Sequence, residues 1–87
     1  MVRIKKYVVY STSVCPHCDS LKKWLNESKI SYEGVDIAAD PTRGMEMIQK
    51  TGQMGVPVSI ITFDDNREEI IIGFDRARLS SLLGIRL

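Results

Sequence analysis

One motif divides this chain into segments of different character: residues Cys15–Cys18, with the sequence CPHC, stand between an apolar run and a segment with helical spacing. The run before it, Ile4–Tyr10, is rich in Val, Ile and Tyr and shows little alternation, which is typical of a short strand covered on both faces. Proline suits the first position of a helix, and apolar residues follow Pro16 at helical spacing. The junction therefore predicts a buried strand, a short loop, and an amphipathic helix that begins at the motif and ends near Lys29.

The remaining segments predict three more strands and two more helices. Because a helix separates the first two strands, they should be parallel and joined by a right-handed crossover. Residues 64–67 have the composition of a hairpin turn, so the strands on either side should pair antiparallel. The order is βαβαββα, an α/β arrangement. After the first helix we expect a strand at Ile30–Ile37, a helix from Pro41 to Gly52 with Asp40 as its N-cap, strands at Val56–Phe63 and Glu69–Ile72, and a helix capped by Asp75 that ends at Gly84.

The length of the chain, 87 residues, allows one modest hydrophobic core, so we expect a single domain over residues 1–87. Pro57 cannot donate a hydrogen bond to a sheet, so its place at the start of a predicted strand needs a reason. The expected apolar faces are Leu21, Trp24 and Leu25 on the first helix, Met45 and Ile48 on the second, and Leu79, Leu82 and Leu83 on the third.

The charges are balanced, with 12 Lys and Arg against 11 Asp and Glu, so no net field indicates nucleic acid or a membrane surface as a partner. The apolar run Tyr7–Tyr10 is much shorter than the roughly 7 to 15-residue core of a signal peptide. We therefore expect a cytoplasmic protein. Reducing compartments disfavour structural disulfides, so a close cysteine pair there is more often catalytic, redox-sensing or metal-binding.

The two cysteines differ in their expected environments. Cys15 at the N-cap would place its sulfur beside the free backbone N–H groups at the positive end of the helix dipole, where a thiolate is favoured. Thiols of Cys-X-X-Cys motifs in such settings have pKa values of roughly 3.5 to 7.5. Cys18, one turn further in, should be less exposed and protonated. Residues three apart share a helix face, so Cys18 could reach back and expel a substrate sulfur bound to Cys15.

Other interpretations of the motif are weaker. A disulfide that closes so small a ring would stabilise the fold by only about 2 kcal/mol, and structural zinc needs four ligands where this motif offers two cysteines and His17. Protonated His17 could stabilise the Cys15 thiolate and make the pair more oxidising, or it could be a solvated helix residue without consequence. Lys22 could likewise add positive potential near Cys18 or belong to a solvated face. An isolated Cys-X-X-Cys beside a βαβ pattern favours redox chemistry of the thioredoxin type.

Three stretches, Tyr10–Cys18, Thr51–Pro57 and Ile72–Asp75, together resemble the glutaredoxins and the related glutaredoxin-like redoxins over essentially the whole chain. The resemblance implies a thioredoxin fold with a central four-stranded mixed sheet flanked by three helices. It also implies that Cys15 is the nucleophile, that Cys18 is the resolving cysteine, and that Pro16 and His17 modulate them. The residues implied to contact substrate are Val56 and Pro57, joined by a cis peptide bond that faces the disulfide, together with Gly73, Phe74 and Asp75.

The chain departs from the glutaredoxins that use glutathione at several positions. Thr12 stands where they commonly carry a lysine, and Asp75-Arg76 stands where they carry an Asp-Asp pair. Ile72 replaces the first glycine of their Gly-Gly turn. The Gly73-Phe74 pair instead resembles the NrdH-type redoxins, which take electrons from thioredoxin reductase and serve ribonucleotide reductase.

We therefore predict a monomeric dithiol disulfide oxidoreductase, an electron carrier that reduces protein disulfides through a redox-active Cys15–Cys18 disulfide and holds no resident metal or other cofactor. Its expected electron donor is a flavoenzyme of the thioredoxin reductase type, and ribonucleotide reductase is a candidate substrate. One alternative is a glutaredoxin that uses glutathione as reductant. An alternative of another class is an iron–sulfur cluster or metal carrier, against which Pro16, directly after the first cysteine, argues.

Overall fold

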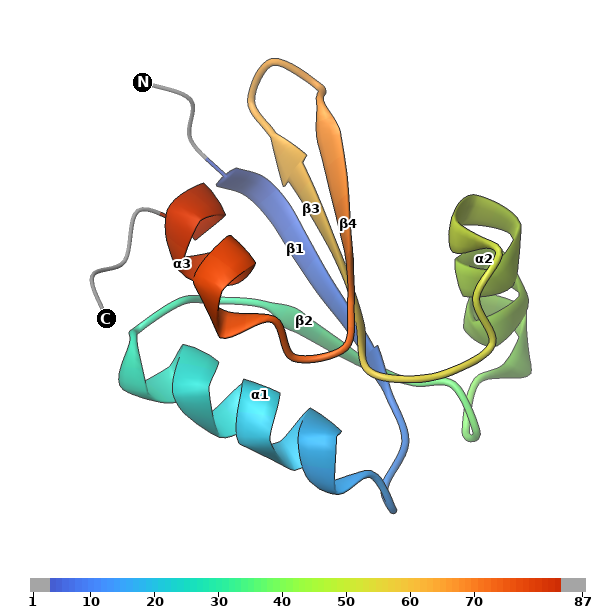
Figure 1. Cartoon of the computed structure of the whole chain (residues 1–87). Helices are drawn as coiled ribbons and strands as arrows, with labels where there is room; N and C mark the ends of the chain where they lie inside the picture. The colour runs from blue at the N-terminus through green and yellow to red at the C-terminus, as the bar shows by residue number, and fades with distance from the viewer. Residues whose placement is uncertain (1–3, 84–87) are drawn as a thin grey trace.

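The computed structural model describes residues 4–83, which form a four-stranded sheet with helices on both faces (Figure 1). The order βαβαββα is the one predicted. The expected end of the last helix at Gly84 lies outside the described residues. The elements are β1 (Ile4–Ser11), α1 (Pro16–Glu27), β2 (Glu33–Asp36), α2 (Pro41–Thr51), β3 (Val58–Phe63), β4 (Glu68–Ile72) and α3 (Arg76–Leu83).

The strands lie in the order β2-β1-β3-β4. β1 pairs parallel with β2, in the register Val9 opposite Gly34, and antiparallel with β3, in the register Val8 opposite Ile60. β3 and β4 pair antiparallel through the hairpin at 64–67, where Asn66 adopts a left-handed conformation with φ 67°. The sheet is therefore mixed, as predicted, and β2 is one of its two edges.

The central strand β1 is buried on both faces, which explains its lack of alternation. Tyr7 and Val9 face α1 and α3 and pack in one core cluster with Leu21. Val8 and Tyr10 face the other way and pack in a second cluster, which contains Met47 of α2. Figure 1 accordingly shows α1 and α3 on one side of the sheet and α2 on the other.

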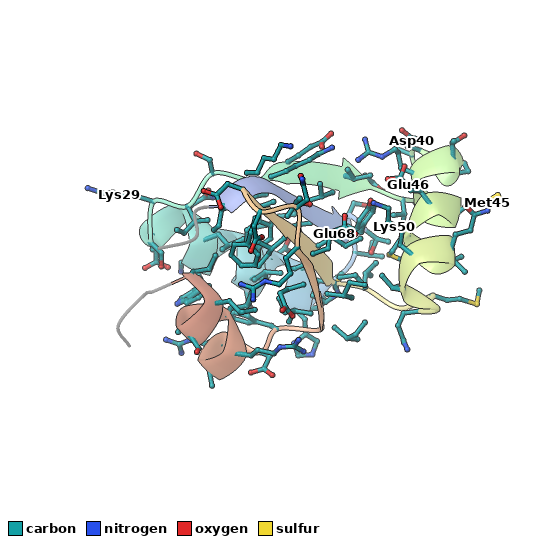
Figure 2. All side chains as sticks on the ribbon, turned by 90° about the horizontal axis from the view of Figure 1, so that it is seen from above. Lys29, Asp40, Met45, Glu46, Lys50 and Glu68 are labelled. Atoms are coloured by element: carbon teal, nitrogen blue, oxygen red, sulfur yellow. The ribbon has the colours of Figure 1, made fainter. Side chains whose placement is uncertain are left out.

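The outer and inner faces of α2 differ from the predicted ones. Met45 and Ile48 do share a face, but it is turned outward, with exposed fractions of 62% and 38%. Figure 2 shows Met45 on the side of α2 that points away from the sheet. The packed face carries Gly44 and Met47, and α2 approaches the residue that follows β2 so closely that a Cβ on Gly44 would lie 3.3 Å from the Cβ of Ile37.

The strands β2 and β3 are both shorter than predicted. α1 ends at Glu27, and Lys29 then adopts a left-handed conformation with φ 59°, so that the chain reverses before it joins the sheet at Glu33. β3 begins at Val58 instead of Val56. Pro57 has no N–H to donate to a ladder, which keeps the first two residues of this segment outside the strand.

Candidate active site at the first turn of α1

Cys15 is the N-cap of α1. Its backbone is extended (φ −112°, ψ 105°), and its sulfur accepts a hydrogen bond from the backbone N–H of Cys18 at 3.2 Å. Pro16 occupies the first helical position, where its missing N–H costs no helical hydrogen bond. Cys15 is half-buried, so its sulfur combines access to solvent with a donor from the helix N-terminus.

Cys18 is completely buried, and both cysteines are in the free thiol form. Burial and a hydrogen bond with Cys15 raise the pKa of the Cys18 thiol to about 11, although a backbone hydrogen bond with Thr12 and the positive charge of Lys22 oppose the shift. At neutral pH the reduced protein therefore keeps a proton on Cys18. The two sulfurs of one motif thus differ in access, with Cys15 half-buried and Cys18 fully buried.

His17 and Pro16 are both exposed on the outer side of the first helical turn. The His17 imidazole takes part in none of the ion pairs found within residues 4–83. Both interpretations of His17, as a modulator of the thiols and as a solvated residue, therefore stay predictions.

The segment Val56–Pro57 lies beside the cysteines although it is about forty residues away along the chain. The peptide bond between these two residues is cis, as the family resemblance implied. The Cys15 thiol donates to the carbonyl oxygen of Val56 at an S···O distance of 3.9 Å, and Pro57 is fully buried beneath it. The structure thus brings the nucleophile candidate and the predicted substrate platform together.

The stretch Gly73–Asp75 is joined to this site at one end and to the core at the other. The N–H of Gly73 donates to the carbonyl oxygen of Pro57 at 2.8 Å, with Gly73 in the left-handed conformation (φ 78°) that favours glycine. The Phe74 ring packs against Trp24 at 5.8 Å between centroids, and an Asp75 carboxylate oxygen accepts the N–H of Arg78 at 3.1 Å as the cap of α3. Phe74 and Asp75 therefore have structural contacts of their own.

Two exposed apolar side chains, one next to Cys15 and one next to the Val56–Pro57 segment in the chain, were not among the predicted site residues. Val14 directly precedes Cys15 and is 86% exposed, and Met54 lies two residues before Val56 and is 77% exposed. The sequence signal that could have identified them is an apolar residue in the loop directly before the reactive cysteine, for Val14, and in the loop before Val56–Pro57, for Met54. They place exposed apolar side chains on the two loops that contain Cys15 and Val56.

Within residues 4–83, no three His, Cys, Asp or Glu side chains come together as a group that could hold a metal ion. In the same part of the chain, no helix has both the length and the apolar composition needed to span a membrane.

The family model described as Glutaredoxin matches residues 7–64, which is more than half of the chain. This chain belongs to the glutaredoxin family. The match includes both cysteines and the cis bond between Val56 and Pro57, whereas Gly73–Asp75 lie beyond it. As a glutaredoxin-like protein with two close cysteines, the chain is a thiol–disulfide redox protein.

Several known proteins resemble this glutaredoxin over most of its length. An uncharacterized glutaredoxin-like 8.6 kDa protein in the rubredoxin operon of Clostridium pasteurianum is 37% identical over 75 residues, which cover 86% of this chain and 93% of that protein. The glutaredoxin-like protein NrdH of Lactococcus lactis is 36% identical over 58 residues, which cover 66% and 75% of the two chains. The crystal structure of the thioredoxin-like protein BC3987 superposes with a TM-score of 0.78 at 27% identity, over 90% of this chain and all of that chain. The predicted thioredoxin fold is confirmed.

Proposed function

We propose that this glutaredoxin-family protein is a dithiol disulfide oxidoreductase in which Cys15 is the nucleophile and Cys18 the resolving thiol. The observation that carries the proposal is the asymmetry of the pair. Cys15 is accessible, and its sulfur accepts a helix N-terminal N–H, whereas Cys18 is buried and keeps its proton at neutral pH. Only the thiolate attacks a disulfide, so the accessible sulfur with a donor at the helix N-terminus is the one suited to begin the reaction.

The reaction transfers two electrons in two exchange steps. The Cys15 thiolate attacks one sulfur of the substrate disulfide, an S–S bond forms between Cys15 and the substrate, and the other substrate sulfur leaves as a thiolate. Cys18 then loses its proton to that departing thiolate or to water and attacks the Cys15 sulfur. The second substrate sulfur leaves, the substrate is reduced to a dithiol, and Cys15–Cys18 is oxidised to a disulfide.

The platform at Val56 supports a peptide substrate. Its carbonyl oxygen is 3.9 Å from the Cys15 sulfur, and the buried Pro57 and the N–H of Gly73 hold the segment in place. An extended peptide that carries the target disulfide could pair with the Val56 backbone in the manner of an added strand. The exposed side chains of Val14 and Met54 would then contact apolar residues of the substrate.

The electron donor we propose is a flavoenzyme of the thioredoxin reductase type. Glutathione is an anionic tripeptide, and its affinity depends on a few charged contacts at its ends. Thr12 supplies no cation, and Arg76 replaces a family carboxylate, so one or two charge-assisted hydrogen bonds would be lost. Each is worth roughly 1.5 to 3 kcal/mol, or about one to two decades of affinity. The likeness to NrdH supports the same choice and extends the proposal to ribonucleotide reductase as a protein substrate in a reducing, cytoplasmic setting.

A coupled NADPH assay tests this proposal. The oxidised protein is supplied either with thioredoxin reductase or with glutathione and glutathione reductase, and NADPH consumption is followed with a protein disulfide as the final acceptor. We expect turnover with thioredoxin reductase and at least about tenfold slower turnover with glutathione at cytosolic concentrations. Faster turnover with glutathione would overturn the choice of donor and leave a glutathione-dependent glutaredoxin.

The proposed modulation by His17 has its own test. If the imidazolium stabilises the reduced state, His17→Ala should make the Cys15–Cys18 couple more reducing by some tens of millivolts. The exposed Lys23→Ala serves as a control for loss of a nearby charge. Equal potentials in wild type and His17→Ala would assign His17 to the solvated helix surface.

A further inference from the structure

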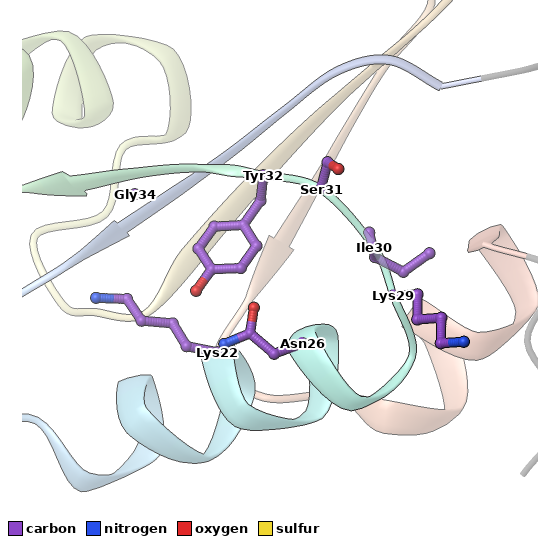
Figure 3. Close-up of a pocket in the computed structure, with 7 residues that line it drawn as sticks. All are labelled: Lys22, Asn26, Lys29, Ile30, Ser31, Tyr32 and Gly34. Carbon is purple, nitrogen blue, oxygen red and sulfur yellow. The ribbon is translucent and has the colours of Figure 1, made fainter.

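A hollow of about 650 Å³ lies between α1 and the segment that leads into β2, away from the Val56–Pro57 platform (Figure 3). It is lined by Lys22 and Asn26 on the helix side and by Ser31, Tyr32 and Gly34 on the strand side. Its volume falls in the range of roughly 300 to 1,000 Å³ that is typical of small-molecule sites. Among its lining residues, Lys22 affects the thiols through the influence of its charge on the pKa of Cys18.

Gly34 is the reason that this space is open. Val35 belongs to the core cluster on the α2 side, and side chains alternate along a strand, so position 34 faces α1. A Cβ at Gly34 would meet nothing closer than a ring carbon of Tyr32 at 3.6 Å. Most strand residues would place a side chain here to close the gap between sheet and helix, and β-branched or aromatic residues are the usual choice.

Three polar side chains, those of Lys22, Asn26 and Tyr32, line the hollow. Lys22 and Asn26 are one helical turn apart and share a face of α1. Figure 3 shows the Tyr32 ring reaching from the strand toward the helix, with the Lys22 side chain to one side of its hydroxyl and the Asn26 side chain to the other, while Lys29 points away. The Tyr32 ring packs in a tilted arrangement against the buried ring of Tyr7, with 6.5 Å between the centroids. This contact restricts the positions that the Tyr32 hydroxyl can take.

These three groups are free to bind a ligand. No side-chain hydrogen bond found within residues 4–83 uses the Lys22 ammonium, the Asn26 amide or the Tyr32 hydroxyl. Each can donate, and an ammonium can only donate. Lys22 is half-buried, in contrast to its exposed neighbour Lys23, so its charge is less screened by solvent.

The charge around the hollow favours an anion. The lining residues include two lysines and no carboxylate. A neighbouring hollow that shares Tyr32 adds Lys5 and Lys6. The carboxylate there, Glu33, is bound to Arg43 at 3.2 Å, and this ion pair lowers the pKa of Glu33. The local field is therefore positive although the chain as a whole is nearly neutral.

We propose that this hollow is a binding site for a phosphorylated small molecule of about mononucleotide size, with the phosphate oxygens accepting from Lys22, Asn26 and Tyr32. A phosphate offers oxygens to each of the three donors that line the hollow, and charge-assisted contacts of this kind are short and strong. The hollow is larger than a phosphate needs, and the rest of the ligand would lie along the Tyr32 ring and over the backbone at Gly34.

The test is an amide NMR titration of the reduced full-length protein with AMP, glycerol phosphate, inorganic phosphate and adenosine as probes. We expect saturable shifts for AMP, confined to residues around 22–34, weaker saturable shifts for the two smaller phosphates, and none for adenosine. Shifts that do not saturate for any phosphorylated probe, or that centre on Cys15, would overturn the proposal. Inorganic phosphate binding as tightly as AMP would overturn the assigned ligand size.

Three variants separate the site from general electrostatics. Lys22→Gln should weaken AMP binding about tenfold or more, because a charge-assisted bond is lost. Gly34→Val should abolish binding by filling the hollow, and its unchanged spectrum elsewhere would show that it folds. Lys23→Gln removes an equal charge one position away, outside the lining, and should leave the affinity unchanged. An equal loss in Lys22→Gln and Lys23→Gln would overturn the assigned donors. Gly34→Val can also be assayed for disulfide reduction, whereas Lys22→Gln removes a charge that acts on the pKa of Cys18 and is therefore compared by AMP binding alone.

Discussion

The two sides of α1 that meet the rest of the molecule are built differently. One side carries Cys18, Leu21 and Leu25, all fully buried against the centre of the sheet. The other side, a quarter turn away, carries Lys22 and Asn26, which face the edge strand across an open hollow. The same helix thus holds a thiol rigidly on one side and leaves space on the other.

The difference follows from what each side has opposite it. The central strands β1 and β3 present large side chains such as Val9 and Ile61, and close packing there removes water from Cys18. The edge strand β2 presents Gly34, so Lys22 keeps its ammonium in partial contact with solvent. A helix that covers a sheet can therefore be closed over the centre and open at the edge, and chemistry that needs a fixed, desolvated group belongs over the centre.

The largest expected effect concerns the two cysteines, Cys18 on the buried side of α1 and Cys15 at the N-cap of the same helix. Cys15→Ser should lower disulfide reduction by several orders of magnitude, since the nucleophile is removed. In the Cys18→Ser variant, Cys15 should still attack the substrate, but the reaction should stop at a mixed disulfide because the resolving thiol is missing. Non-reducing electrophoresis and mass spectrometry detect this mixed disulfide. Equal trapping by both variants would mean that burial does not distinguish the two sulfurs.

A large loss of stability is expected on the closed side alone. Leu21→Ala should lower the free energy of unfolding by about 2 to 5 kcal/mol, because it leaves a cavity in a fully buried position. Asn26→Ala, on the open side of the same helix, should change it by no more than about 0.5 kcal/mol. Urea denaturation of both variants measures the contrast. Similar losses would show that the two sides are packed alike.

The burial of Cys18 also predicts a pH dependence. The folded protein holds the Cys18 proton up to a pKa of about 11, whereas the unfolded chain releases it near 9.0, so this contribution is complete below pH 9 and is lost as the pH rises to about 11. The loss amounts to about 3 kcal/mol at most. Denaturation of reduced wild type and reduced Cys18→Ala between pH 8 and 11 isolates it, because the buried tyrosines are common to both. Parallel curves would contradict the burial of a protonated thiol.

The smallest expected effect is on the open side. Gly34→Val should raise the free energy of unfolding by up to about 1 kcal/mol, since a strand residue gains propensity without a steric clash. Gly44→Val is the matched change at a closed contact, where the new Cβ meets Ile37 at 3.3 Å, and it should destabilise the protein by about 1 to 3 kcal/mol. Thermal melting of the two variants measures both changes. A change of the melting temperature in the same direction for both variants would contradict the prediction.

Much of this protein was predictable because its local signals are strong. The element order, the parallel and antiparallel pairings, the start of α1 at Pro16 and the caps at Asp40 and Asp75 all follow from residues within a few positions of one another. The identity of the cysteine pair as the candidate site follows in the same way. Propensity, capping and dipole effects act over one helical turn, and a sequence records them directly.

The sequence by itself therefore determined the elements, their order and the position of Cys15 at a helix N-terminus. Tertiary structure decided which face of α2 is buried, because Met45, Met47 and Ile48 offer two competing apolar faces and only the close approach of Gly44 to Ile37 selects one. It also decided the contact between Cys15 and the Val56 carbonyl, the complete burial of Cys18, and the hollow at Gly34. Each of these depends on distances between residues far apart in the chain, which are set by the packing of whole elements and are not recorded in any local pattern.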